Sequence, residues 1–282
     1  MRSSRLAISF RSACSTLLFV LSSFLLLLSL AVALPAQELE QLAVGPPQIH
    51  RVEPPSATAT AKELERIGDA LQADKDYLDG IDYYQAALGK DPQNAVLVNK
   101  IGISELEMHR YREAKKRFEQ SVRIDKSYAN AYANLGVVYY QQTSYSKSIR
   151  YYDKAISLDK DEAVFYNNRA ASLFAKKEFG KASTDYAKAL DLDPDIFERT
   201  GRGGGVQARL PSPEDRAHYD YVLAKLYARN GMVDRSLHYL RKAMEDGYKN
   251  IKSVYTDNEF SELRKDPRFA ELMATKPVAI RD

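Results

Sequence analysis

The feature that most constrains the fold of this chain is a period of 34 residues. Gly68, Gly102 and Gly136 follow one another at this spacing, and Ala170 stands at the next step. An alanine lies seven residues before each of them, so the blocks 61–94, 95–128, 129–162 and 163–196 can be drawn. A period of this length over at least three blocks is typical of proteins in which each unit buries its apolar face only against its neighbours.

Each block repeats small and aromatic residues at fixed offsets. A second small residue lies twelve positions after the first, an aromatic follows four positions later, and a third small residue three positions after that. The aromatic position holds Tyr84, Phe118, Tyr152 and Tyr186. We expect two antiparallel helices per block, in which small residues permit close approach and aromatic rings fill the space between neighbouring blocks.

This pattern resembles the tetratricopeptide repeat, over residues 61–275. The resemblance implies an all-α fold, a right-handed superhelical solenoid of antiparallel helix pairs with a C-terminal capping helix region. A fifth unit at 217–250 follows an interruption, with Ala224 at the small position. Residues 251–282 are then expected to hold one more helix, a turn at Asp266-Pro267, a short final helix and a tail. Two residues depart from the family pattern: Glu105 replaces a core residue, and Arg169 replaces an aliphatic one.

The first 36 residues predict an export signal. They contain three arginines and no acid, then an apolar run at 17–34, then small residues suited to cleavage after Ala33 or Ala36. The run is also long enough to approach a membrane span, so an uncleaved anchor stays an alternative. Either reading places the protein outside the cytosol, in the periplasm or cell envelope of a bacterium, in the second case anchored to the inner membrane.

Charge and cysteine content narrow the functions further. Removing the three leader arginines from 41 basic residues leaves 38, equal to the 38 acidic residues, so no basic field remains to attract nucleic acid. The one cysteine, Cys14, lies in the leader, so the rest of the chain has no disulfide or thiolate metal site. Between leader and repeats, residues 37–60 contain two Pro-Pro pairs and predict a linker, and Thr60 with Glu63 predicts a capping box that starts the first helix.

Co-chaperones of the family grip a partner's C-terminal carboxylates with basic and asparagine side chains from three repeats. The equivalent places here, in windows opening at Ala61, Ala95 or Ala129, never supply three cations, so this clamp is absent. The resemblance instead places a row of amides and neighbouring polar residues on the inner, concave face, suited to holding an extended peptide backbone. The row comprises Asn99, Lys100, Asn130, Asn134, Tyr140, Gln141, Asn167 and Asn168. The alternative is that these amides are solvated and bind nothing.

The interruption at 197–216 is rich in glycine and arginine. Its spacing fits neither a dinucleotide fingerprint nor a P-loop, so a loop between repeats with Phe197 and Val206 packed on the solenoid is the simplest interpretation. Insertions in repeat arrays often carry binding function, so Arg199, Arg202 and Arg209 are candidate contacts to an acidic partner.

No catalytic motif, metal-ligand spacing or cofactor fingerprint occurs in the sequence. We therefore expect a non-catalytic protein-interaction module or scaffold of the cell envelope, without cofactor or metal, that binds a protein or peptide. Membrane contact is expected only if the leader is retained. A membrane-anchored accessory subunit of an envelope enzyme or assembly complex is the alternative. A chaperone-binding co-chaperone is less well supported, since the clamp cations are missing.

Overall fold

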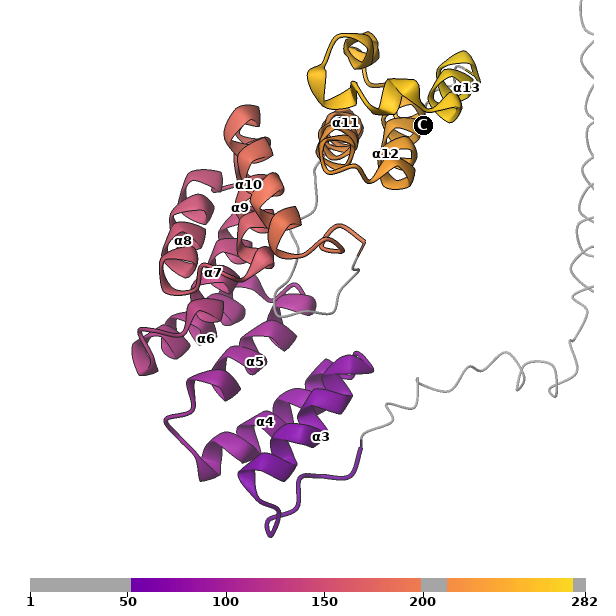
Figure 1. The fold of residues 1–282 in the computed structure, drawn as a ribbon. Coiled ribbons are helices and arrows are strands. Elements are labelled where there is room, and N and C mark those ends of the chain that lie inside the picture. The colour runs from indigo at the N-terminus through magenta and orange to yellow at the C-terminus, as the bar shows by residue number, and fades with distance from the viewer. Residues whose placement is uncertain (1–51, 199–211, 276–282) are drawn as a thin grey trace, which may run out of the picture. The chain divides into compact units, whose positions relative to one another are not determined.

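The computed structural model describes residues 52–198 and 212–275, and within these ranges it is helical and contains no strand. Eight helices form four consecutive pairs (Figure 1): α3 and α4 (Ala61–Ala73, Tyr77–Lys90), α5 and α6 (Ala95–Glu107, Tyr111–Ile124), α7 and α8 (Ala129–Gln141, Tyr145–Leu158), α9 and α10 (Ala163–Ala175, Phe179–Leu192). A fifth pair consists of α11 (Pro213–Arg229) and α12 (Val233–Glu245). The expected all-α fold of packed helix pairs is confirmed.

Local capping explains where the first helix starts. The hydroxyl of Thr60 accepts a hydrogen bond from the backbone N–H of Glu63 at 3.2 Å, and the Glu63 carboxylate accepts one from the backbone N–H of Thr60 at 2.8 Å. The predicted capping box is therefore confirmed. The first helices of the next three pairs begin at Ala95, Ala129 and Ala163, one sequence period apart.

The periodic aromatic rings pack inside their own helix pairs. A side-chain carbon added at Gly68 would lie 2.6 Å from the ring of Tyr84, and one added at Gly136 would lie 2.8 Å from the ring of Tyr152. Both rings are fully buried. Each lies against the glycine of its own first helix, where a residue without a side chain leaves room. The rings also pack against the next block, as expected: Tyr84 shares an apolar cluster with Leu97 and Ile101, and the ring centroids of Tyr186 and Tyr219 are 5.2 Å apart.

The turn inside each pair places one residue in the left-handed backbone region. Lys75, His109, Thr143 and Lys177 have φ angles of 70°, 60°, 56° and 64°. Gly231 has φ of 72° at the equivalent place of the fifth pair. The left-handed residue lets the chain reverse within a few residues, at a cost for every residue except glycine.

The fifth pair begins earlier than the sequence period indicates. Helix α11 starts at Pro213, inside the range 197–216 assigned to the interruption. Ser212 caps it, since its hydroxyl accepts a hydrogen bond from the backbone N–H of Asp215 at 3.1 Å, and proline suits the first helical position. These local signals extend the helix by one turn before the repeat pattern begins.

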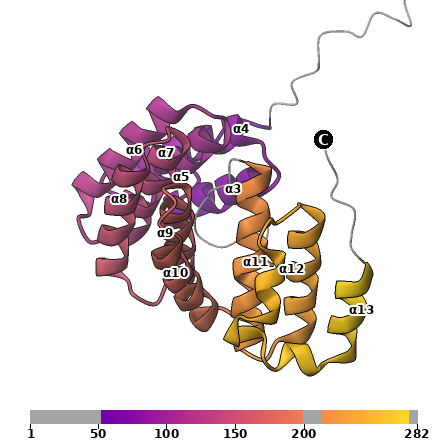
Figure 2. The same cartoon turned by 90° about the horizontal axis from the view of Figure 1, so that it is seen from above.

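The C-terminal region covers the last pair with less regular structure than we expected (Figure 2). The additional helix predicted before Asp266 is instead three short 3₁₀ helices, Ile251–Tyr255, Asn258–Phe260 and Leu263–Lys265, followed by α13 (Pro267–Thr275). The guanidinium of Arg264 donates to the backbone carbonyls of Val254 and Asp257, at 2.9 and 2.8 Å, which holds this segment in a tight path. Val254, Phe260 and Leu263 are buried by that path, and one straight helix does not place all three on a single face.

At the other end, part of the predicted linker contacts the first helix pair. The hydroxyl of Tyr83 donates a hydrogen bond to the backbone carbonyl of Glu53 at 2.7 Å. The ammonium group of Lys90 donates one to the backbone carbonyl of Ala57 at 2.9 Å. Ala59 packs against the apolar cluster around Leu64. Residues 53–59 thus cover α4 instead of forming a free spacer. The predicted export signal lies outside the described residues, and no helix among the described ones could span a membrane.

Candidate functional site

One face of the first helices carries most of the predicted binding residues. We call it the ladder face and define it as the second, fifth, sixth, ninth and thirteenth residues of α5, α7 and α9. This spacing forms one stripe along a helix. Its members are Val96, Asn99, Lys100, Ile103 and Glu107 on α5; Asn130, Ala133, Asn134, Val137 and Gln141 on α7; and Val164, Asn167, Asn168, Ala171 and Ala175 on α9.

The three central asparagines of this face are buried. The exposed fractions of Asn99, Asn134 and Asn168 are 2%, 0% and 1%. Asn134 Nδ2 donates a hydrogen bond to Asn99 Oδ1 at 2.9 Å, and Asn99 Nδ2 in turn lies 3.5 Å from the hydroxyl of Tyr128. The expectation that these three amides are exposed is wrong. The side chain at the sixth place of α7 reaches the preceding first helix, so it joins two repeats.

The same place in the second repeat makes the same kind of link with charged groups. Lys100 Nζ lies 2.7 Å from Glu65 Oε1 and 2.7 Å from Asp69 Oδ1, both on α3. Burial opposes the charge on Lys100, but the hydrogen bonds to Asp69 and Glu65 outweigh it and raise the pKa of Lys100. In the second and third repeats, the sixth place therefore connects consecutive first helices.

Other members of the ladder face remain accessible. Gln141 is exposed, Asn130 and Asn167 are partly exposed, and Val96 is 38% exposed. Neither Gln141 nor Asn167 makes a hydrogen bond to another described residue, so both retain their donors and acceptors. The remaining predicted residue, Tyr140, is buried and packs against Tyr145 at 5.3 Å between ring centroids. The predicted set thus divides into a buried structural part and an accessible part.

The predicted contacts in the interruption cannot be placed. Arg199, Arg202 and Arg209 lie outside the described residues, as does Val206. Phe197 does pack on the repeats, with ring centroids 5.9 Å from Tyr186 and 6.1 Å from Tyr227.

The two residues that depart from the repeat pattern, Arg169 and Glu105, are charged residues that lie within packed regions and pair with residues of opposite charge. Arg169 Nε and Nη2 each lie 2.7 Å from the carboxylate of Asp185, and Nη1 lies 2.8 Å from Asp153. This two-pronged pairing fixes the planar guanidinium in place of an aliphatic residue. Glu105 is buried, and Arg117 Nε lies 3.4 Å from its Oε1. Burial raises the pKa of Glu105, although the charge of Arg117 works in the other direction.

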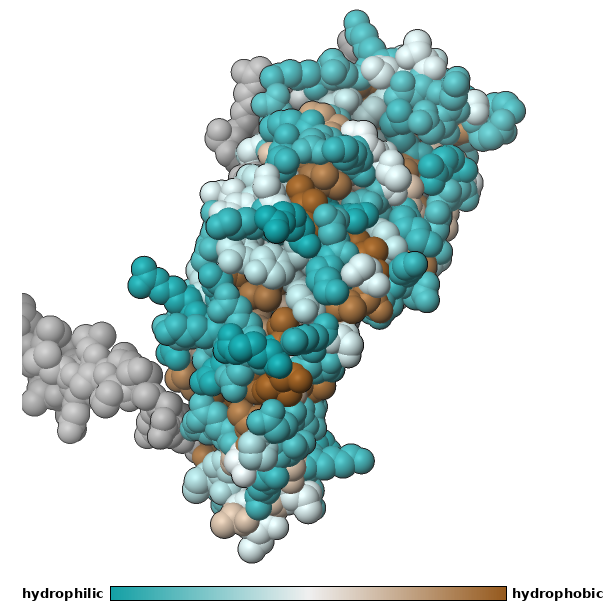
Figure 3. All heavy atoms as spheres, turned by 90° about the vertical axis from the view of Figure 1, so that its left-hand side faces the viewer, coloured by the Kyte–Doolittle hydropathy of each residue, from teal (hydrophilic) through white to brown (hydrophobic). Residues whose placement is uncertain are grey.

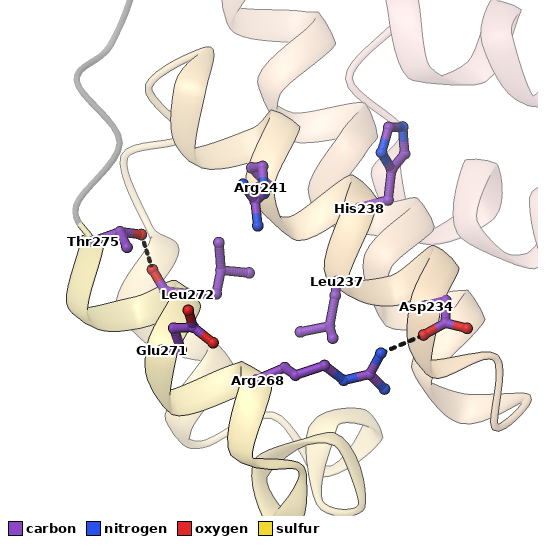
Figure 4. Close-up of a pocket in the computed structure, with 8 residues that line it drawn as sticks. All are labelled: Asp234, Leu237, His238, Arg241, Arg268, Glu271, Leu272 and Thr275. Carbon is purple, nitrogen blue, oxygen red and sulfur yellow. Dashed lines mark hydrogen bonds and ion pairs between the residues drawn. The ribbon is translucent and has the colours of Figure 1, made fainter.

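A second candidate surface lies between α12 and α13 (Figure 4). Its cavity of about 500 Å³ has Leu237 and Leu272 among its lining residues, with His238, Arg241 and Glu271. Arg268 Nη1 lies 2.6 Å from Asp234 Oδ1, and Nη2 lies 2.8 Å from Asp266, so this cation already has partners. The contacts hold α13 against α12. We therefore interpret the cavity as a consequence of how the C-terminal helix docks.

The face shown in Figure 3 offers no comparable feature, since hydrophobic residues occur there in small separate groups among hydrophilic ones. Four large hydrophobic residues are exposed within the described ranges: Val52, Leu78, Val96 and Tyr255. The described residues also contain no group of three or more His, Cys, Asp or Glu placed to hold a metal ion. Of the four exposed hydrophobic residues, Val96 belongs to the ladder face.

Comparison with known proteins agrees with this architecture. Residues 92–161 and 163–196 match two family models, each described as tetratricopeptide repeat. No curated protein sequence matches the chain.

Similar solved structures include a crystal structure of MamA, 22% identical, covering 66% of this chain and 97% of that one with a TM-score of 0.44. Another is YrrB, "a TPR protein with an unusual peptide-binding site", 17% identical, covering 70% and 91% with a TM-score of 0.43. A third is TTC0263, a thermophilic TPR protein in Thermus thermophilus, 20% identical, covering 76% and 99% with a TM-score of 0.47. The two family matches show that residues 92–161 and 163–196 are tetratricopeptide repeats, and helix pairs with the same period of 34 residues extend this architecture over 61–192.

Proposed function

We propose that this protein is a non-catalytic scaffold of the cell envelope that binds an extended segment of a partner protein along the ladder face. The observation that supports this proposal is that some amides of the ladder face are buried and others are accessible. Asn134 and Asn99 hold consecutive first helices in register, while Asn130, Gln141 and Asn167 present amides that a partner can reach. A rigid backbone with accessible polar groups is the arrangement that binds with little loss of conformational freedom.

An amide side chain can donate to and accept from the same peptide unit of a bound segment. Accessible amides on α7 and α9 therefore suit the main chain of an extended partner, and the exposed aliphatic surface of Val96 suits one of its side chains. Recognition of this kind depends on backbone shape more than on particular partner residues.

The location follows from the leader at 1–36, whose three arginines, apolar run and small residues support export. The alternative, a membrane-anchored accessory subunit of an envelope enzyme or assembly complex, requires that the leader be retained. Mass spectrometry of the mature protein separates these versions, because a peptide containing Leu21 is expected only from the anchored form. A chaperone-binding role has less support, since Lys100 is already held by Glu65 and Asp69.

The test of binding is affinity capture from a cell-envelope extract with the full chain and two variants. In the first variant, Asn130, Gln141 and Asn167 are replaced by alanine. In the control variant, Leu78 and Tyr255, which are exposed outside the ladder face, are replaced by alanine. We expect the same captured partner with wild type and the control variant, and its loss with the first variant. Thermal unfolding checks that both variants are folded. Equal capture by all three would reject the ladder face as the binding site.

A further inference from the structure

The ladder face contains very few charges. Of its fifteen residues only Lys100 and Glu107 are ionisable, and they have opposite signs. The cation is already bound at 2.7 Å by two carboxylates of α3, so it is not available to a ligand. The other accessible members are amides and aliphatic side chains, among them the exposed Val96, the partly exposed Asn167, and Ile103, which is half-buried against the core.

Building on the proposed function, we propose that the bound segment is uncharged and that main-chain hydrogen bonds and apolar contacts hold it. A ligand carboxylate on this face meets no unpaired cation, and removing a charge from water without a partner is costly. A ligand ammonium meets the exposed Glu107, and an exposed pair of that kind contributes little, while Glu65 and Asp69 beside this face already pair with Lys100. Charge therefore selects against ionic segments here.

The apolar contribution comes from α5. Val96 and Ile103 lie seven residues apart, two turns along the same face, with Lys100 between them. Their separation along the helix is about 10 Å, at 1.5 Å per residue. Side chains on one side of an extended chain recur every second residue, about 7 Å apart. A segment that crosses this helix lengthwise can therefore place two uncharged side chains, two residues apart, over the surface between Val96 and Ile103.

The experiment uses a phage-displayed library of random peptides selected on the purified full chain. We expect enrichment of uncharged sequences rich in aliphatic residues. The best peptide is then synthesised with a free and with an amidated C-terminus. Because no ion pair forms, its Kd is expected to change less than about twofold between the two forms, and less than about twofold between roughly 0.05 M and 0.5 M NaCl.

Three variants locate the site. Val96→Asp, alone and with Ile103→Asp, is expected to weaken binding at least about tenfold, while Leu78→Asp, at another exposed aliphatic position on α4, leaves it unchanged. Thermal unfolding checks that each variant is folded, because Ile103 also packs against the core.

The outcomes separate the two proposals. Enrichment of acidic peptides, or a Kd that rises more than about tenfold with salt, overturns the inference and leaves a peptide-binding function standing; the exposed Lys62 and Arg66 of α3 are then the first residues to test. If no peptide is enriched, or if the α5 variants bind with an unchanged Kd, the proposed binding at the ladder face is rejected as well.

Discussion

Asn134 donates a hydrogen bond of 2.9 Å to the side-chain oxygen of Asn99, a residue 35 positions earlier on the preceding first helix. Both amides are almost fully buried. The pair therefore fixes how two repeats stack, and it does so inside the surface that was expected to bind a ligand.

We expect Asn134→Ala to lower the free energy of unfolding by about 1–3 kcal/mol, because Asn99 is left with an unpaired buried acceptor. A double-mutant cycle with Asn99→Ala is expected to give a coupling energy of at least about 0.5 kcal/mol. Urea denaturation followed by circular dichroism measures both quantities. Asn167→Ala is the control and should stay within about 0.5 kcal/mol of wild type. Additivity of the two buried substitutions would contradict the role of the hydrogen bond.

Gly136→Ala is expected to destabilise the protein by about 1–3 kcal/mol, since the added carbon would lie 2.8 Å from the fully buried ring of Tyr152. Gly180→Ala on α10 is the matched control, because nothing lies within 4 Å of an added carbon there. The better helix propensity of alanine should make that variant more stable by up to about 1 kcal/mol. Thermal unfolding of both variants tests the pair, and similar effects of the two substitutions would show that the ring contact is not limiting.

Thr143→Gly is expected to stabilise the protein by about 0.5–1 kcal/mol. Thr143 has a φ of 56°, where a branched side chain is strained and glycine is not. The reverse change, Gly231→Ala, places a side chain at φ 72° and should cost about 1 kcal/mol, although open space surrounds the site. Calorimetry on both variants separates backbone strain from packing, since the substitutions should shift Tm in opposite directions.

Asp220→Asn is expected to make stability less dependent on pH. Burial of Asp220 and the nearby charge of Asp246 raise its pKa from 3.8 to about 6, while Lys242 at 3.7 Å opposes the shift. The folded state thus binds this proton more tightly than the unfolded chain does. The resulting stabilisation is complete below pH 3.8 and is lost as the pH rises through 6.

At pH 7.5 the neutral amide introduced by Asp220→Asn avoids the cost of a buried charge, so this variant should be more stable than wild type by about 1–3 kcal/mol. The difference should shrink towards pH 4.5, where Asp220 is protonated. Denaturation curves at several pH values between these limits measure it. A difference that does not vary with pH would mean that Asp220 remains ionised throughout, as in an exposed position.

Much of the fold could be predicted from the order of residues alone. The positions of Ala61, Ala95, Ala129 and Ala163 coincide with the first residues of four helices, because the repeat period reflects one helix pair per unit. The capping box at Thr60 could also be predicted, because it involves only two residues that are three positions apart. The repeat period predicts too late a start for α11, because Ser212 and Pro213, which start it, lie before the repeated pattern.

The candidate site was harder to predict. The period places the amide row at equivalent positions of successive first helices, but the exposure of each amide depends on distances between helices. Nothing in the sequence distinguishes Asn134, which bonds across to Asn99, from Asn167, which reaches no described partner. Asn99 and Asn167 both occupy the fifth place of a first helix, yet Asn99 is buried and Asn167 is partly exposed.

The sequence by itself determined the helices of the first four repeats, their pairing and the near neutrality of the ladder face, because periodicity, capping and charge are properties of residues close together in the chain. Only the tertiary structure decided which polar groups hold consecutive repeats together, as Lys100 and Asp69 do, and which remain accessible to a partner. That division depends on side chains about 30 or more residues apart coming within 3 Å, which is set by the packing of one repeat on the next.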